Sequence, residues 1–168
     1  MRLRRLLLGV ATLGVTTLGL AGCTPYMPLP EDAQVTRIVV DKSQRSMVLL
    51  DGFRRVGRFP IHLGFAPKGH KQTEGDGKTP EGSYTIDRRN PQSAFHLSLG
   101  ISYPSAEDVK EASRLGEDPG GDIFIHGLPK GYSVVEADWT NGCIAVSNED
   151  IEALYKAVQD GTPITIRP

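Results

Sequence analysis

The sequence predicts a β-rich α+β domain, and three observations support this fold class. Short runs of β-branched and apolar residues recur along the chain, separated by turns in which many of the 19 glycines and 12 prolines lie. Only two segments have the spacing of an amphipathic helix. Residues 34–168 contain no internal repeat and are long enough for one domain with its own core.

Residues 1–22 have the features of a signal peptide. Three arginines, the last of them Arg5, precede an apolar stretch from Leu6 to Leu20 that is short for a membrane span. The Leu-Ala-Gly-Cys sequence that follows resembles a bacterial lipobox, which implies cleavage before Cys23 and acylation of that cysteine. The alternative is an ordinary cleaved signal followed by an unmodified cysteine.

Lipidation of Cys23 would place the protein in the cell envelope. Several acyl chains on one residue give stable membrane anchoring. Thr24, in place of aspartate, favours the periplasmic face of the outer membrane. Residues 23–33 are polar and rich in proline, and we expect them to form a lipid-anchored tether that lifts the domain off the membrane.

Charge and composition do not indicate a nucleic-acid partner. Without the three leader arginines, 16 basic residues stand against 20 acidic ones, and no basic stripe with interleaved aromatics is present. The sequence also lacks HExxH, CxxC or comparable ligand spacing. We therefore predict neither a metal site nor a cofactor.

The first part of the domain has the pattern of consecutive strands. Val35–Asp41 and Ser46–Asp51 are apolar or β-branched runs on either side of a turn at Lys42–Arg45, which predicts a hairpin. A third strand is expected within Phe53–Leu63, with three side chains facing the core: Val56, Phe59 and Ile61. A glycine- and proline-rich loop over residues 64–82 then leads into a further strand, at Ser83–Ile86.

Three more strands are predicted in the second part. Ala94–Tyr103 alternates and ends at Pro104, Asp122–Ile125 is a short buried run that delivers His126, and Ile164–Arg167 closes the domain.

Two helices are predicted between these strands. Each begins with the spacing of a capping box, at Ser105/Asp108 and Ser147/Asp150. The first has a narrow apolar face of Ala106, Val109 and Ala112, and Gly116 ends it. The second ends at Asp160–Gly161 and has a broader apolar face: Ile151, Leu154, Tyr155 and Val158.

The stretch Gly120–Asn148 holds a candidate catalytic pair. His126 ends an apolar run, and Cys143 follows 17 positions later as the only cysteine besides Cys23. An imidazole can take the proton of a thiol, and the thiolate is the species that attacks a carbonyl. The alternative is a small buried cysteine and a structural histidine. In an oxidising compartment a lipidated Cys23 leaves Cys143 without a disulfide partner, which favours a chemical role.

Gly142 precedes the candidate nucleophile and lets the backbone approach a substrate closely. We expect the N–H groups of Gly142, Cys143 and Ile144 to point at the oxygen that gains charge during acyl transfer. One such donor is worth roughly 3–4 kcal/mol of barrier.

The other three histidines are interpreted as non-catalytic. His70 lies in the 64–82 loop without a cysteine or carboxylate at ligand spacing, and we expect it to be solvated. His62 and His96 fall on predicted strands and are expected to be structural. If the base were not His126, His70 would be the next candidate.

The residues around the pair resemble the catalytic signature of the L,D-transpeptidase (YkuD-like) family. That signature is a histidine in an HG or HS pair, followed by Ser/Thr-x-Gly-Cys-x-x-x-Asn. The matching positions are His126, Gly127, Thr140, Gly142, Cys143 and, more loosely, Asn148. The GDGKTPEG segment at Gly75–Gly82 also resembles a family motif, although turn formation alone would explain its glycines and proline. The resemblance implies a β-sandwich with one or two short packed helices as the catalytic domain, over residues 34–168.

The resemblance also implies a role for each matching residue. Cys143 would be the nucleophile, His126 the general base, and the carbonyl of Gly127 would orient the imidazole, with the Gly142 N–H as an oxyanion donor. Most members have histidine or arginine where Asn141 stands, and this departure resembles the YafK-like branch of the family. The candidate substrate contacts are Trp139, Thr140 and Asn141.

Three functions are consistent with these residues. The first is L,D-transpeptidation, in which a thioester forms on a stem peptide at meso-diaminopimelate, D-alanine leaves, and an amine accepts the acyl group. The second is an amidase or endopeptidase that hydrolyses the same thioester, cleaving cross-links or a peptidoglycan–lipoprotein link. The third is a non-catalytic lipoprotein that binds peptidoglycan, with an inert Cys143. The expected partners are peptidoglycan stem peptides and the membrane, the latter through Cys23.

Overall fold

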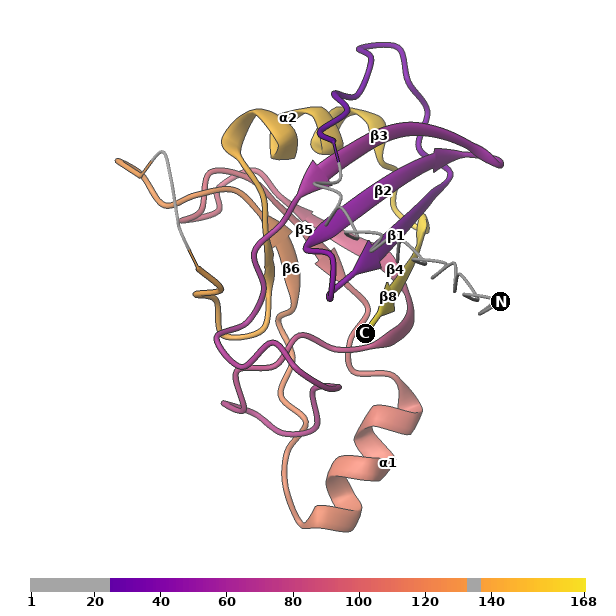
Figure 1. Cartoon of the computed structure of the whole chain (residues 1–168). Coiled ribbons are helices and arrows are strands. Elements are labelled where there is room, and N and C mark those ends of the chain that lie inside the picture. Colours follow the sequence, from indigo (N-terminus) through magenta and orange to yellow (C-terminus); the bar gives the residue numbers. More distant parts are fainter. Residues whose placement is uncertain (1–24, 133–136) are drawn as a thin grey trace, which may run out of the picture.

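The computed structural model in Figure 1 describes residues 25–132 and 137–168. The predicted signal peptide and Cys23 lie outside these residues. Within them the chain forms the following elements: β1 (Arg37–Asp41), β2 (Ser46–Asp51), β3 (Arg54–Pro60), β4 (Gly82–Asn90), β5 (Ser98–Ile101), α1 (Ala106–Leu115), β6 (Phe124–His126), β7 (Ile144–Ala145), α2 (Asn148–Ala157) and β8 (Pro163–Arg167).

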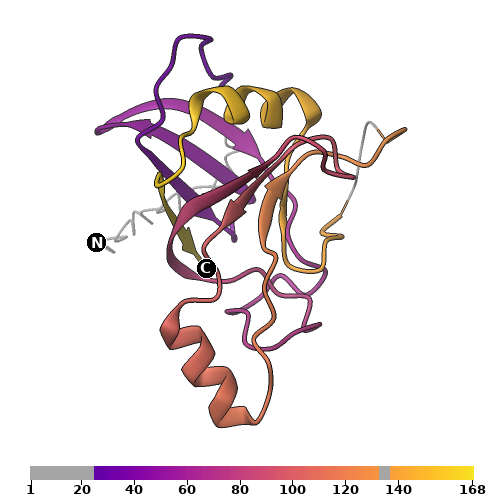
Figure 2. The same ribbon diagram turned by 180° about the vertical axis from the view of Figure 1, so that it is seen from behind.

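These strands form one curled sheet with the order β3-β2-β1-β8-β4-β5-β6-β7. Neighbours are antiparallel except for β1 with β8 and β6 with β7, which are parallel. The sheet folds over itself, so that β1–β3 lie in front of β4–β6 in Figure 1 and behind them in Figure 2. The prediction of a β-rich α+β fold with two short helices is confirmed.

The core lies between the two layers of the sheet. Alternate residues of β1 and β2 point inward, and Ile38, Val40, Met47 and Leu49 are fully buried. The prediction that Val56, Phe59 and Ile61 face the core is also confirmed. Helix α2 covers one open end of the layers (Figures 1 and 2) and buries Ile151 and Leu154.

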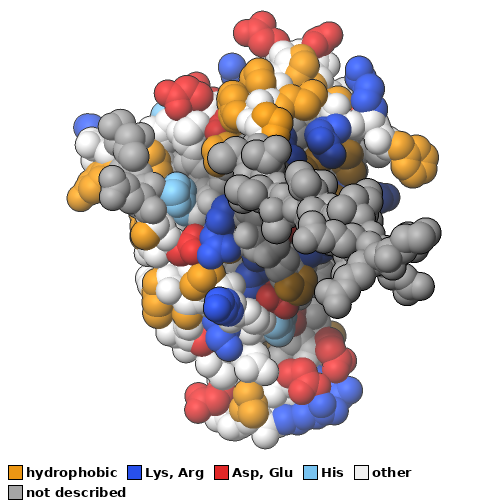
Figure 3. All heavy atoms as spheres, viewed as in Figure 1, with side chains coloured by type: hydrophobic (Ala, Val, Ile, Leu, Met, Phe, Trp, Pro, Cys, Tyr) orange, Lys and Arg blue, Asp and Glu red, His pale blue; other side chains and the backbone are white. Residues whose placement is uncertain are grey.

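Helix α1 projects away from the sheet (Figure 1). Its capping box is present, with Ser105 and Asp108 bonded reciprocally, and Gly116 ends it with a left-handed φ of 74°. The predicted apolar face is wrong at two positions, because Ala106 and Val109 are exposed, Val109 to 44%, while Asp108 is buried. Burial of that carboxylate is stabilised by the Tyr84 hydroxyl, which donates to it over 3.1 Å. Charges of both signs cover the projecting end in Figure 3. Helix α1 also contains the i,i+3 ion pair of Glu107 with Lys110.

Helix α2 ends earlier than the sequence pattern predicts. It stops at Ala157, where Arg89 of β4 donates to the carbonyl oxygens of Tyr155 and Val158 and so satisfies its last turn. Its capping box is only half formed. The Asp150 N–H donates to the Ser147 hydroxyl over 3.0 Å, but the carboxylate of Asp150 accepts from the Tyr26 hydroxyl instead.

The strand predicted at Ala94–Tyr103 is shorter than expected. Only Ser98–Ile101 is extended and paired, and residues 91–97 form a turn-rich loop. His96 has a left-handed φ of 70°, which ends any strand at that point. Its Nε2 lies 2.7 Å from the Glu152 carboxylate, so His96 is a loop residue held by α2.

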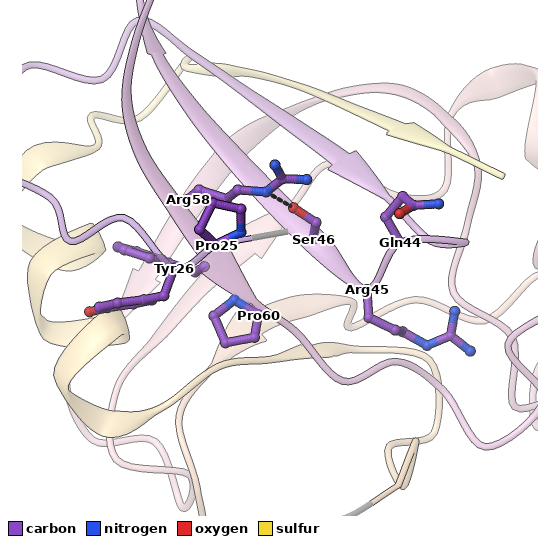
Figure 4. Close-up of a pocket in the computed structure, with 8 residues that line it drawn as sticks. Pro25, Tyr26, Gln44, Arg45, Ser46, Arg58 and Pro60 are labelled. Carbon is purple, nitrogen blue, oxygen red and sulfur yellow. Dashed lines mark hydrogen bonds between the residues drawn. The ribbon is translucent and has the colours of Figure 1, made fainter. Parts of the chain in front are cut away.

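The N-terminal segment is docked on the sheet, not free as a tether. Met27 exchanges two backbone hydrogen bonds with Arg58 of β3, at 2.8 and 2.9 Å. The Tyr26 ring stacks on Phe59, and Pro25 and Tyr26 line a shallow pocket over β2 and β3 with Ser46 and Pro60 (Figure 4). Two backbone hydrogen bonds and the stacked ring hold this segment on the sheet, although Tyr26 itself is 56% exposed. In the part of the chain described here, no helix is both apolar enough and long enough to cross a bilayer.

Candidate active site

His126 lies at the end of β6 with its imidazole almost completely buried. Its Nδ1 is 2.7 Å from the carbonyl oxygen of Gly127, the contact that the sequence resemblance implies. A carbonyl oxygen only accepts hydrogen bonds, so Nδ1 carries the proton and Nε2 keeps its lone pair. Phe95 packs against the imidazole with ring centroids 4.5 Å apart, and Trp139 meets it edge-on at 5.6 Å. The tautomer and the ring plane of His126 are therefore both fixed.

The turn after His126 leaves no room for a side chain at Gly127. A Cβ there would lie 2.5 Å from the Oδ1 of Asn148 and 3.0 Å from the Phe95 carbonyl oxygen. The Gly127 N–H donates to that same Phe95 oxygen, and the Leu128 N–H donates to Asn148 Oδ1 over 2.8 Å. The Leu128 N–H belongs to the same peptide group as the Gly127 carbonyl. Asn148, the loosest match of the signature, therefore holds in place the carbonyl that orients His126.

Cys143 stands directly before β7, next to β6. The parallel register pairs Ile125 with Ile144 and His126 with Ala145, and one step back it places Cys143 opposite Phe124. Side chains alternate along strands, so Cys143 and His126 project from the same face of the sheet as diagonal neighbours. Such neighbours have Cβ atoms roughly 7 Å apart, within reach of a thiol and an imidazole.

Burial keeps both members of this pair neutral. It raises the pKa of the Cys143 thiol, an effect that the Phe124 N–H opposes and the Asp122 carboxylate reinforces, while Lys71 and Arg88 oppose it more weakly. Burial also lowers the pKa of His126, only partly offset by the Gly127 carbonyl. The resting pair is therefore a thiol and a neutral imidazole, and the imidazole is ready to accept a proton.

Thr140 shapes the turn that carries the nucleophile. Its hydroxyl donates to the Cys143 carbonyl oxygen over 2.7 Å and accepts from the Gly142 N–H over 3.1 Å. Its backbone bonds to Leu63 and Phe65, and the residue is buried. Thr140 was predicted to contact the substrate, but its hydroxyl both donates and accepts a hydrogen bond inside the turn. Its role here is to position Cys143.

The same hydrogen bond changes the predicted oxyanion site. The Gly142 N–H points at Thr140 and is not free for a substrate oxygen. Across the described ranges, no hydrogen bond from the Cys143 N–H to another residue is found, so this group stays available as a donor. Gly142 instead has a steric role, because its φ is 130° and a Cβ would lie 2.7 Å from the Lys78 carbonyl oxygen.

The Gly75–Gly82 segment supports the nucleophile turn from below. A Cβ on Gly64 would lie 2.1 Å from the Gly77 oxygen and 3.0 Å from the Gly142 Cα, so three backbones are packed together here. The buried Thr79 hydroxyl accepts from the Gly64 N–H over 3.0 Å. Asp76 holds the loop closed, because its carboxylate accepts from the N–H groups of Gln72, Thr73 and Lys78. Burial alone would raise the pKa of Asp76, but these hydrogen bonds and the Lys71 ammonium lower it below its usual value.

Two positioning residues, Asp138 and Phe95, were not predicted from the sequence. Asp138 accepts from the guanidinium of Arg45 through Nε and Nη2, the latter at 2.7 Å, and from the Leu63 N–H at 2.9 Å. This ion pair fixes the start of the Trp139–Thr140 segment against the β1–β2 turn. Arg45 and Asp138 are 93 positions apart, so no local pattern connects them. Phe95, the ring over His126, was likewise assigned only to a strand.

The two remaining substrate candidates differ in exposure. Trp139 is half-buried against Phe95 and His126, and its indole Nε1 is the single buried side-chain polar atom without a partner in the described residues. Asn141 is exposed, two positions before the nucleophile. Both therefore remain candidate contacts for a substrate.

The other histidines stay out of the site chemistry. His70 was expected to be solvated, but its Nε2 lies 3.0 Å from the buried Asp108 carboxylate and its Nδ1 accepts from the Glu81 N–H. His62 pairs through its backbone with Ala145 at an isolated bridge. No group of three or more His, Cys, Asp or Glu residues is placed to hold a metal ion within residues 25–132 and 137–168.

Comparison with known families gives a match over almost the whole described domain. The family model of the L,D-transpeptidase catalytic domain (YkuD) matches residues 35–166. Among curated proteins, YafK of Escherichia coli K12, provisionally named an L,D-transpeptidase, is 29% identical over 93 residues. That match covers 54% of this chain and 32% of YafK, so the chain corresponds to about a third of its curated relative.

Solved structures have the same fold. The helical cell shape determining protein Pgp2 of Campylobacter jejuni matches with a TM-score of 0.64 and 29% identity, over 84% of this chain and 49% of Pgp2. Bd1075 of Bdellovibrio bacteriovorus matches at 0.58 and 26% identity, over 84% and 50%. An L,D-transpeptidase of Xylanimonas cellulosilytica matches at 0.53 with 16% identity, over 84% and 64%, which shows a shared fold. The chain spans about half the length of Pgp2 and Bd1075.

Proposed function

This chain belongs to the L,D-transpeptidase catalytic domain family, and we propose that it is a cysteine acyltransferase acting on peptidoglycan stem peptides. The observation that carries the proposal is the fixed tautomer of His126. With Nδ1–H bound to Gly127, the free lone pair of Nε2 is on the ring nitrogen that can take the Cys143 proton. A merely structural histidine in this place would not need a dedicated glycine turn and Asn148 to hold its partner carbonyl.

The first half of the reaction forms a thioester. Nε2 of His126 removes the thiol proton as the sulfur of Cys143 bonds to the stem-peptide carbonyl carbon. The Cys143 N–H stabilises the oxygen that becomes negative. When the C–N bond breaks, the imidazolium gives its proton to the departing D-alanine amine, leaving an acyl group on sulfur and a neutral histidine.

The second half resolves the thioester. His126 deprotonates an incoming acceptor amine, the amine attacks the acyl carbon, and the thiolate leaves and recovers the proton. Asn141 is neutral, so a protonated amine meets no repelling charge there. Trp139 offers an apolar face on which a second stem peptide can pack. These two residues are our candidates for the acceptor side.

A second candidate function is hydrolysis of the same thioester. The same two residues would carry it, because His126 can deprotonate a water molecule as well as an amine once the acyl group is on Cys143. Water in place of the amine would make the protein an amidase or endopeptidase of the cell wall.

One incubation distinguishes these functions. A purified tetrapeptide stem is supplied with and without a diaminopimelate-containing acceptor. Transfer predicts a cross-linked dimer that increases with acceptor concentration. A shortened tripeptide whose amount ignores the acceptor would refute transfer and support hydrolysis. No product, together with a Cys143 that no thiol reagent labels, would leave the non-catalytic binding protein.

We further propose that Cys23 carries the lipid and holds the domain at the periplasmic face of the outer membrane. The support is the lipobox-like sequence before Cys23 and the threonine after it. Cys23→Ser should move the full chain from the membrane pellet to the soluble periplasmic fraction. Its continued presence in the pellet would contradict lipid anchoring at this residue.

A further inference from the structure

The sheet aligns Arg88 with the nucleophile in one cross-strand row. Arg88 of β4 pairs with Gly100 of β5, and Gly100 pairs with Phe124 of β6. The register of β6 with β7 places Cys143 next in the same row. Residues opposite one another in a sheet project from the same face. Arg88 and Cys143 therefore face the same side, with Gly100 and Phe124 between them.

Gly100 leaves the space through which Arg88 crosses the row. A Cβ on Gly100 would lie 2.3 Å from the Cγ of Arg88 and 2.9 Å from its Nε. The side chain extends over this gap, and its guanidinium carbon lies 4.6 Å from the centroid of the Phe124 ring. The guanidinium thus reaches the side chain of Phe124, whose strand is the neighbour of the strand that follows Cys143.

The guanidinium of Arg88 is held but not saturated. Nη1 binds the Asp87 carboxylate at 2.9 Å, and Nη2 has only a 3.4 Å contact with Asp122, whose side chain is 92% exposed. Asp122 also connects the two groups, because its carbonyl oxygen accepts from the Cys143 thiol over 3.5 Å. A long contact to an exposed carboxylate is worth little and is easily exchanged for another carboxylate.

Lys71 is a second cation near the thiol, but it is already occupied. Its side chain is 3% exposed, and its ammonium donates to the Thr73 carbonyl oxygen and to Asp76 at 2.8 and 3.1 Å. Arg88, 39% exposed, is the cation that an incoming ligand can reach.

We propose that Arg88 is a specificity residue that binds a free carboxylate of the substrate beside Cys143. A guanidinium matches a carboxylate through two parallel N–H bonds. This inference rests on the proposed function, since stem peptides carry two such groups near the reacting carbonyl: the C-terminus of the leaving D-alanine and the second carboxylate of diaminopimelate. A carboxylate of the substrate replaces the Asp122 carboxylate at Nη2 of Arg88, which brings the reacting carbonyl toward the sulfur of Cys143.

The first test needs no substrate. Iodoacetate and iodoacetamide alkylate the same thiolate, but only iodoacetate is an anion, so the ratio of their rates at Cys143 reports the attraction of an anion. We expect Arg88→Gln to lower this ratio about fivefold at low salt, and 0.5 M salt to abolish the difference. The matched control is Arg55→Gln, at an exposed arginine of β3, which should leave the ratio unchanged.

Two further variants separate charge from structure. Arg88→Lys keeps the charge and should keep the ratio close to that of the wild type. Gly100→Ala leaves Arg88 in the sequence but displaces its side chain, and should lower the ratio as Arg88→Gln does. A ratio that Arg88→Gln leaves unchanged, in a protein with an unaltered melting temperature, would overturn the proposal. If that variant does not fold, Gly100→Ala decides in its place.

The second test identifies the carboxylate. Three tetrapeptide stems are compared: unmodified, amidated at the D-alanine terminus, and amidated at the second diaminopimelate carboxylate. Arg88→Gln should reduce kcat/KM about tenfold for stems that keep the recognised carboxylate and have no effect on the stem that lacks it. An equal loss on all three would mean a structural role and overturn the proposal. If the wild type processes none of them, the proposed function fails, while the alkylation ratio still decides whether Arg88 forms an anion site.

Discussion

The two ends of the curled sheet are built in different ways. At one end, β1, β2 and β3 are regular strands of five to seven residues, and alternate side chains such as Ile38 and Leu49 are fully buried. At the other, β5, β6 and β7 have only four, three and two residues. There the backbone is fixed by side chains that bond to it, from Thr140, Asn148, Asp138 and Thr79.

This contrast separates stability from catalytic precision. Apolar burial is non-directional and tolerates small shifts, so it suits the end that only has to hold the sheet together. Hydrogen bonds to single backbone groups fix atoms to tenths of an ångström, which a nucleophile and its base require. Substitutions at the two ends should therefore change different measured quantities.

The largest effect is expected at the nucleophile. Cys143→Ala should reduce turnover by at least about a thousandfold, because the atom that forms the thioester is gone. It should leave the melting temperature almost unchanged, since only a sulfur atom is lost from packing. Turnover of purified stem peptide and thermal unfolding measure the two quantities. Residual activity above about a hundredth would rule out covalent catalysis by this residue.

His126→Ala should cost nearly as much, and the double variant no more than either single one. Base and nucleophile act as one unit, so their effects are not additive. Additive losses in the double variant would place the base on another residue.

The opposite end should show the reverse behaviour. Leu49→Ala should lower the free energy of unfolding by about 2–5 kcal/mol, because it opens a cavity in a fully buried part of β2. Turnover per folded molecule should stay within about twofold of the wild type. Denaturant unfolding and active-site titration by thiol labelling provide both values. A fall in kcat larger than this would show that the two ends are mechanically coupled.

A smaller loss is expected when the turn hydroxyl is removed. Thr140→Val keeps the shape of the side chain but removes the bonds to the Cys143 oxygen and the Gly142 N–H. We expect kcat/KM to fall about 10- to 100-fold, with a stability loss of about 1–3 kcal/mol. Thr140→Ser restores the hydroxyl and should recover most of the activity. Its failure to do so would mean that the methyl group, not the hydroxyl, holds the turn.

The smallest effect expected is a shift in the pH dependence of thiol alkylation and of kcat/KM. Burial raises the pKa of Cys143, so its alkylation by neutral iodoacetamide should have a midpoint above the value of about 8.5 for an ordinary cysteine. The rate should rise with pH through that midpoint, because the thiolate is the reactive form. Burial lowers the pKa of His126, so protonation of the base should reduce kcat/KM only below about pH 6.5. A midpoint well below 8.5 would indicate a preformed ion pair.

The sequence predicts the regular end of the sheet better than the end with the site. The β1–β2 hairpin and the apolar face of α2 follow from periodicity, which is local. At the other end, the lone cysteine and the HG pair indicate the candidate nucleophile and base, because their chemistry is visible in the residue types. The residues that position them are not visible in the sequence. The contacts of Asp138 with Arg45 and of Phe95 with His126 join residues that are distant in the chain and are brought together by the strand order.

Some differences between the predicted and the observed contacts have a common cause, which is that polar groups compete for the same partners. Thr140 and Gly142 were assigned to the substrate, but each satisfies the other within the turn. Asp150 matches a capping box, but its carboxylate binds Tyr26, 124 positions away. A side chain with several possible partners cannot be assigned from spacing alone, since the partner chosen depends on the tertiary fold.

The docking of Tyr26 and Met27 on the sheet would limit how far the proposed active site can work from the proposed lipid anchor. Only two residues, Thr24 and Pro25, separate Cys23 from Tyr26, a span of at most about 10 Å even when fully extended. If Cys23 is acylated as we propose, the active site stays close to the lipid headgroups. It then reaches no deeper into the cell wall than the width of the domain. Inserting a long Gly/Ser segment before Tyr26 would increase the distance from the membrane that the active site can reach, without altering the site itself. The substrates available in the cell would then depend partly on which layer of the wall lies within this reach.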